Sequence, residues 1–227
     1  MTRATDRAVA MLSERLASTI DRAIRTVVEH RGPALAAAAD TLRAEHPRED
    51  PGRLVGIAVR RRSWQLAGTG AVSSLPAVLP GPGTMAEIGA ALGDVTLLTA
   101  AQVELILMAA HLFGRPLTDQ DARLLDVLMV LGIDVGAVKL RRDGAVEALG
   151  TSYAAGEFRG ARADALAKRV SARLAIQVTA RLARRRAHVI LGREIPLLGI
   201  GLAAGYNLRS TRGLGDTTVR FFRHIAG

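Results

Sequence analysis

Three ionisable side chains on one expected helix are the best candidates in this chain for acid–base or metal chemistry. Asp94, Glu104 and His111 fall within the apolar segment 85–113, and Glu104 and His111 are seven residues apart. A helix returns to the same face after seven residues, so a buried carboxylate and imidazole at this spacing could hold a metal ion or move a proton. The alternative interpretation, which we favour, is a polar pair satisfied within a packed helix.

Other motifs for catalysis or cofactor binding are missing from the sequence. There is no cysteine, and no two of the five histidines have the spacing of metal ligands on one helix. The glycines of segments 68–70 and 81–83 lack the spacing of phosphate-binding loops, and Ser73 and Ser74 lie outside a nucleophile elbow. We therefore expect no catalytic residue, no metal and no cofactor, and the sequence favours a non-enzymatic role.

Positive charge is concentrated in the C-terminal third of the chain. The formal net charge is +10 over 227 residues, and residues 157–186 carry nine basic and two acidic side chains. A concentrated basic surface attracts anionic lipid, nucleic acid or an acidic protein. If the partner is anionic lipid, we expect the head groups to contact four arginines near the end of this segment, Arg181, Arg184, Arg185 and Arg186.

A charge-free apolar segment, residues 195–208, follows the basic segment. Its 14 residues are too few to cross a bilayer, for which a helix needs about 20 residues. Close packing of another helix, in lipid or in a protein core, is allowed by three small residues, Gly199, Gly201 and Gly205. We expect anchoring in a membrane interface by three aromatic residues, Trp64, Phe221 and Phe222.

Composition and periodicity predict an all-α fold, a single compact multi-helix domain. Hydrophobic residues make up 49% of the chain and aromatic residues 3%, so the core must consist mainly of aliphatic side chains, among which Ala and Leu favour helices. Apolar residues recur at spacings of three and four. We expect helices over residues 5–29, 34–45, 54–67, 85–113, 157–191, 195–208 and 216–225, with one starting after Thr118. Residues 1–50 are expected to pack as amphipathic helices on a domain formed by residues 51–227.

Proline, glycine and capping residues predict where these helices begin and end. Residues 68–83 are rich in glycine and proline and predict a loop, and Gly114 to Pro116 ends the long apolar helix. Thr118, with Asp121 three residues later, predicts an N-cap. The helix over residues 85–113 is apolar on nearly every face, so we expect it to be buried at the centre of the domain.

The order of these signals resembles the EcsC family of bacterial proteins. The resemblance covers roughly residues 70–225. It is carried by the turns Ser74–Pro76 and Leu79–Gly83, by Gln102, Glu104 and His111–Gly114, and by Ile195–Gly199, Ala204–Asn207, Arg212 and Phe222. The family is named from a member encoded beside an ABC transporter, and its own activity is not established. The resemblance implies a helical fold and a membrane-related setting, without an enzyme mechanism. Phe113 stands where family members often have tyrosine, so no role for that hydroxyl carries over.

These observations predict a cytoplasmic, peripherally membrane-associated protein with an accessory or regulatory role in envelope or transport processes. The alternating charges of the N-terminus contain no apolar core of a secretory signal. The expected partners are an anionic membrane surface and a transporter or envelope protein. One alternative is a soluble binding module for nucleic acid or an acidic protein. The other is an enzyme, or a metal- or lipid-binding site, built on Asp94, Glu104 and His111.

Overall fold

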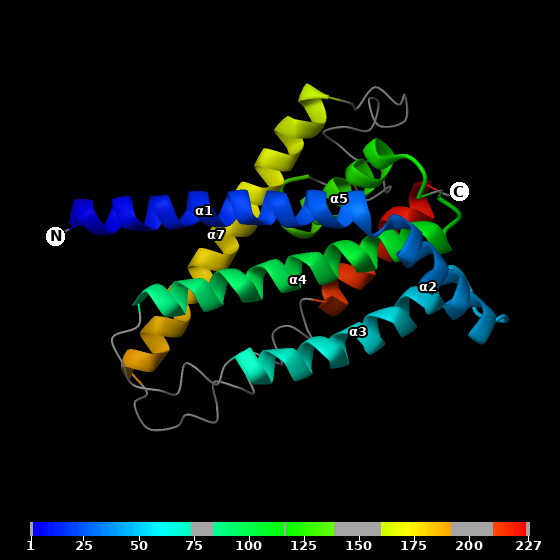
Figure 1. Ribbon diagram of the computed structural model, residues 1–227, viewed down its shortest axis with the longest axis horizontal. Coiled ribbons are helices and arrows are strands. Elements are labelled where there is room, and N and C mark those ends of the chain that lie inside the picture. The colour runs from blue at the N-terminus through cyan, green and yellow to red at the C-terminus, as the bar shows by residue number, and fades with distance from the viewer. Residues whose placement is uncertain (1, 74–83, 116, 139–159, 192–210, 226–227) are drawn as a thin grey trace.

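The computed structural model describes residues 2–73, 84–115, 117–138, 160–191 and 211–225 (Figure 1). Every regular element within these ranges is a helix, so the all-α prediction is confirmed. The elements are α1 (Thr2–His30), α2 (Gly32–Glu45), α3 (Pro51–Ser73), α4 (Thr84–Leu112), α5 (Gln120–Asp134) and α7 (Ala161–Leu191). Residues 211–225 form a further helix, called here the C-terminal helix.

The apolar helix α4 lies at the centre of the fold, as its sequence predicts. Figure 1 shows it between α1 and α3, and it contacts α1, α2, α3 and α5. Several of its side chains, including Val103, Ile106 and Leu107, are completely buried. Gly114 ends the helix with a φ of +81°, a left-handed conformation that glycine adopts readily at this position.

Among the described residues, one helical stretch, Val95–Leu112, is long and apolar enough to cross a membrane. Length and composition alone are weak evidence for a span, because the core helix of a folded domain has the same properties. Just over half of this stretch, 56%, is buried against the rest of the protein. Its hydropathy is therefore accounted for by packing between the surrounding helices.

Helices α1 and α7 pack against each other in opposite directions. Ser13 near the start of α1 is 3.3 Å from Thr179 near the end of α7 (Oγ to Oγ1), and Arg25 Nη2 near the end of α1 donates to Asp164 Oδ1 at 2.7 Å. The predicted apolar stripe of α1 is buried, from Leu16 to Val27. Burial of each such aliphatic side chain stabilises the fold by about 1.5–3 kcal/mol.

The C-terminal helix places its two phenylalanines in the core, so their predicted role as interfacial anchors is wrong. Phe221 is 1% exposed and Phe222 0%. The Phe222 ring stacks on Phe113 at the end of α4, with 5.9 Å between ring centroids, and meets the edge of Phe221 at 5.2 Å. The physical reason is volume. In a core of small aliphatic side chains, these large rings fill the space where the C-terminal helix meets α4.

Several helix boundaries differ from the prediction. The C-terminal helix begins at residue 211 instead of 216. Residues 68–73 continue α3 instead of starting a loop, because a helix tolerates isolated glycines at about 1 kcal/mol each and the first proline comes only later, at residue 76. The N-cap of α5 is Asp119, one residue after Thr118, and its carboxylate accepts hydrogen bonds from the backbone N–H groups of Asp121 and Ala122. The carboxylate satisfies two of the free donors at the start of α5.

The close contact between the C-terminal helix and α3 gives a test of the fold with a control in the same helix. A Cβ atom on Gly215 would lie 2.7 Å from Val59 Cγ2, whereas a Cβ on Gly213 would meet nothing within 4 Å. We expect Gly215→Ala to lower the free energy of unfolding by about 1–3 kcal/mol through overpacking. Gly213→Ala should raise it by about 0.5–1 kcal/mol through helix propensity. Urea unfolding followed by circular dichroism measures both, and equal effects would contradict this packing.

Candidate functional site

Glu104 pairs with two arginines from other helices, and not with His111. Its Oε1 lies 3.0 Å from Arg31 Nη2 in an ion pair, and its Oε2 pairs with Arg62. The Glu104 side chain is 13% exposed, whereas those of Arg31 and Arg62 are 55% and 36% exposed. A carboxylate at this depth is stabilised by two opposite charges, so Glu104 joins the start of α2 and the middle of α3 to the central helix.

His111, seven residues after Glu104 on α4, contacts a different residue, Asp40 of α2. Its Nε2 lies 2.9 Å from Asp40 Oδ1 of α2, with the imidazole 24% exposed and the carboxylate 59% exposed. Seven residues separate Glu104 from His111, a rise of about 10 Å along the helix axis. Glu104 and His111 therefore do not share one metal or acid–base site, because each has a different partner elsewhere in the fold. Both are satisfied polar groups of a packed helix, which is the interpretation that we favoured from the sequence.

The described residues contain no group of side chains that could hold a metal ion. The side chain of Asp94, the third residue of the predicted set, lies outside the described part of the structure. Elsewhere in that part, no three His, Asp or Glu side chains are grouped closely enough to hold a metal ion. The alternative of an enzyme built on Asp94, Glu104 and His111 thus loses its geometric support.

A small cavity lies between α1, α4 and α7. It is lined by both apolar and polar side chains, among them Ile20, Gln102 and Gln177. Its volume is about 40 Å³, enough for one or a few water molecules, whereas sites for small organic ligands span roughly 300–1,000 Å³. The cavity therefore suits buried water bridging the two amides, and it is too small for a lipid chain.

The exposed face of α7 combines positive charge with one apolar side chain. Arg162, Lys168, Arg169 and Arg173 are all exposed, and Ile176 is 58% exposed. Arg162, Arg169, Arg173 and Ile176 follow one another at spacings of seven, four and three, so they share one side of the helix, and Lys168 lies at its edge. We call these five residues the basic face of α7.

The single acidic side chain in the described part of α7 is paired away from the basic face. Asp164 binds Arg25 of α1 at 2.7 Å, and Arg25 also binds Asp21 at 3.1 Å. The hydrogen bond from Asp164 raises the pKa of the Arg25 guanidinium above its ordinary value, although partial burial acts in the opposite direction. The aspartate is thus neutralised by α1, and the solvent side of α7 stays cationic.

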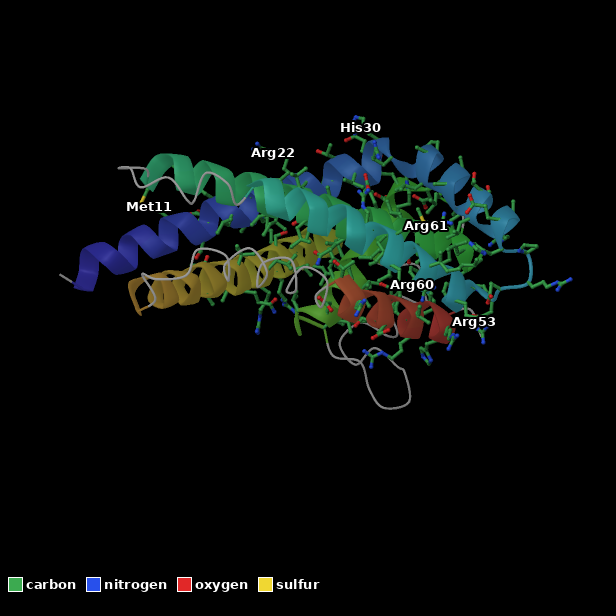
Figure 2. The ribbon with its side chains drawn as sticks, turned by 90° about the horizontal axis from the view of Figure 1, so that it is seen from below. Met11, Arg22, His30, Arg53, Arg60 and Arg61 are labelled. Atoms are coloured by element: carbon green, nitrogen blue, oxygen red, sulfur yellow. The ribbon has the colours of Figure 1, made fainter. Side chains whose placement is uncertain are left out.

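The C-terminal helix adds arginines on the same side of the molecule. Figure 2 shows α7 and the C-terminal helix along the lower side, whereas Arg22 and His30 of α1 point toward the upper side. Arg212, Arg220 and Arg223 of the C-terminal helix are exposed, together with one acid, Asp216. The two helices therefore lie on the same side of the molecule, and each carries exposed basic side chains, one of which, Arg223, pairs with Asp50 at 3.4 Å.

The side chains of the remaining predicted site residues lie outside the described part of the structure. Arg181, Arg184, Arg185 and Arg186 belong to the helical backbone of α7, and Trp64 to that of α3, with side chains outside the described set. Gly199, Gly201 and Gly205 fall in the segment 192–210, which is also outside it. Their roles in lipid contact, anchoring and helix packing stay predictions.

Comparisons with known proteins give no relative for this chain. No protein-family model, no curated protein and no solved structure matches it. The resemblance to the EcsC family therefore stays a prediction from the sequence, and the functional argument rests on the residues themselves.

The two-arginine site of Glu104 generates a prediction about stability. Removing the charge with Glu104→Gln leaves two guanidinium groups facing each other at a mostly buried position. We expect the free energy of unfolding to fall by about 1–3 kcal/mol, between the values for surface and fully buried ion pairs.

The matched control is Glu45→Gln. Glu45 pairs with Arg61 at 2.9 Å, but both side chains are about half exposed. An exposed pair contributes little, so this variant should lose less than about 0.5 kcal/mol. Denaturant unfolding measures the free energy of unfolding of both variants. A decrease for Glu104→Gln no greater than that for Glu45→Gln would rule out a stabilising role for the Glu104 ion pairs.

Proposed function

We propose that this protein binds peripherally to the surface of an anionic membrane through the basic face of α7. The observation that carries the proposal is the combination, on one exposed helix face, of four cationic side chains and a large exposed aliphatic residue, Ile176. Cationic groups beside an apolar residue are typical of helices that lie in the plane of a membrane interface.

The expected strength is that of a reversible surface contact. Each basic residue close to an anionic surface contributes about 1 kcal/mol, so the four on α7 provide about 4 kcal/mol at physiological salt. Insertion of Ile176 at the head-group level adds at most about 1.5–3 kcal/mol. We assign the later arginines of the same helix, Arg181 and Arg184–Arg186, and those of the C-terminal helix to the same contact.

The cellular role that fits this binding is accessory or regulatory. We propose a cytoplasmic protein that assists an envelope or transport process and works beside a transporter or another envelope protein. The support for this part is the sequence resemblance of residues 70–225 to the EcsC family.

Vesicle flotation tests the membrane contact directly. We expect the protein to float with phosphatidylglycerol-containing vesicles at low salt and to stay behind with pure phosphatidylcholine vesicles. The triple variant Lys168→Gln, Arg169→Gln, Arg173→Gln removes about 3 kcal/mol of attraction, which corresponds to about a 100-fold lower partition coefficient.

The control for this variant removes as many charges from other parts of the surface. Arg15, Arg22 and Arg48 are exposed on α1 and in the turn after α2, so their triple Gln variant should keep most of the binding. Equal loss in both triple variants would mean that net charge alone governs the contact. A salt-dependent gel shift with nucleic acid, without flotation, would favour the nucleic-acid alternative.

Ile176 provides a test that does not depend on charge. We expect Ile176→Ser to weaken vesicle binding about tenfold, because the head-group contact loses its inserted apolar side chain. Leu97→Ser is the matched control, since Leu97 is 61% exposed and lies on α4. Titration of vesicles against intrinsic fluorescence measures both variants. Binding unchanged in Ile176→Ser would remove insertion from the proposal and leave an electrostatic contact only.

A further inference from the structure

Arg123 is an arginine that the fold buries without a partner among the described residues. It lies on the first turns of α5 and is 7% exposed, and its Nε is buried with no hydrogen-bond acceptor. Within the described residues its guanidinium makes no ion pair or hydrogen bond. Burial of a charged group without a counter-charge is unfavourable, so a native structure that keeps one calls for an explanation.

The carboxylates nearest to Arg123 along α5 have other partners. Asp119, four residues before it, caps α5 through the N–H groups of Asp121 and Ala122. Asp126, three residues after it, is 4% exposed by side chain and binds Arg115 Nε at 2.7 Å. The counter-charge of Arg123 therefore does not come from the acidic side chains of its own helix.

The guanidinium of Arg123 points instead at the start of α2. The atom nearest to a Cβ built on Gly32 is Arg123 Nη1, at only 2.0 Å, and the next residue contact is Leu117 O at 3.4 Å. The N-cap of α2 is Arg31, which makes no side-chain capping bond, and a proline follows in the first turn. This 14-residue helix thus begins without a side-chain cap and beside a cation, and since Pro33 has no N–H, its first-turn donors are those of Gly32 and Ala34.

We propose that Arg123 and the N-terminus of α2 form a binding site for a small oxyanion of the phosphate class. The first turn of a helix attracts anions through its free N–H groups and the positive end of the helix dipole. A guanidinium binds two phosphate oxygens at once through parallel N–H groups. An oxyanion at this point would supply the charge that Arg123 lacks and the cap that α2 lacks.

Two other arginines of the described part of this region are already paired. Arg31 is held by Glu104, and Arg115 is held by Asp126. Gly32 is required because any side chain there would displace the guanidinium. The site shares no residue with the basic face of α7, so the oxyanion proposal can be tested separately from the membrane proposal.

Calorimetric titration of the full-length protein with inorganic phosphate, against chloride at matched ionic strength, tests the site. We expect phosphate-specific binding that weakens at least about tenfold in Arg123→Met, because a charge-assisted hydrogen bond is lost. Gly32→Ala should weaken it as well, since the added Cβ displaces Nη1. Arg123→Lys, which keeps the charge but not the two-pronged geometry, should be intermediate.

Arg22→Met is the control, because Arg22 is an exposed arginine on the upper side of α1 (Figure 2). Its phosphate affinity should equal that of the unmodified chain. Absence of phosphate binding, or equal binding by Arg123→Met and Arg22→Met with native circular dichroism, would overturn the proposal. If Arg123→Met does not fold, the phosphate affinities of Gly32→Ala and Arg123→Lys are compared with that of Arg22→Met instead, and equal affinities would overturn the proposal.

The same titration identifies the source of the oxyanion. Soluble dihexanoyl phosphatidic acid that competes with phosphate and binds more tightly would assign the site to a lipid head group. Equal or weaker binding than inorganic phosphate would assign it to a free phosphate. Both outcomes retain Arg123 as the residue that binds the oxyanion. Vesicle flotation of Arg123→Met should equal that of the unmodified chain if the oxyanion is free phosphate, and should fall with vesicles that contain phosphatidic acid if it is a lipid head group.

Discussion

The fold depends on the need of α4 to be covered on several sides. This helix is apolar around nearly its whole circumference, so α1, α2, α3 and α5 must surround it, and the C-terminal helix closes its end through the ring of Phe222. Helix α7 then packs chiefly on α1 and α5. Its position in the outer layer is what leaves one of its faces to solvent, and that face carries the arginines.

The sequence predicted where the described helices lie, but it did not predict which side chains of different helices contact each other. Periodicity and caps predicted the helices because hydrogen bonds and apolar stripes repeat within a few residues. The pairing of Glu104 with Arg31 and Arg62 joins positions far apart in the chain, and no local pattern records it. The spacing of Glu104 and His111 indicated one face correctly, but other helices supplied a nearer partner for each. For Phe221 and Phe222, amphipathic context could not tell a membrane from a protein core, since both bury aromatic rings.

Arginine has two distinct uses in this molecule that net charge does not separate. Some arginines pair with acidic side chains that are mostly buried between helices, so their charge is neutralised within the protein; these are Arg31, Arg62 and Arg115. The described arginines of the basic face of α7 and of the C-terminal helix are exposed and contribute to the external field, offset in part at Arg223 by its ion pair with Asp50 at 3.4 Å. A buried cation such as Arg123 belongs to neither group. It could be recognised only once the positions of Asp119 and Asp126 were known.

The pairing of α1 with α7 also has a consequence for folding during synthesis, because the two helices are made at different times. Ser13 and Thr179 meet across 166 positions of the chain. At about 5–20 residues per second, α1 leaves the ribosome roughly 10–30 s before its partner has been made. During that interval the stripe of Leu16, Ile20 and Ile24 has no α7 to cover it. The contacts of α1 with α4 and α5 can therefore form first, and its contact with α7 forms only after the last third of the sequence has been made.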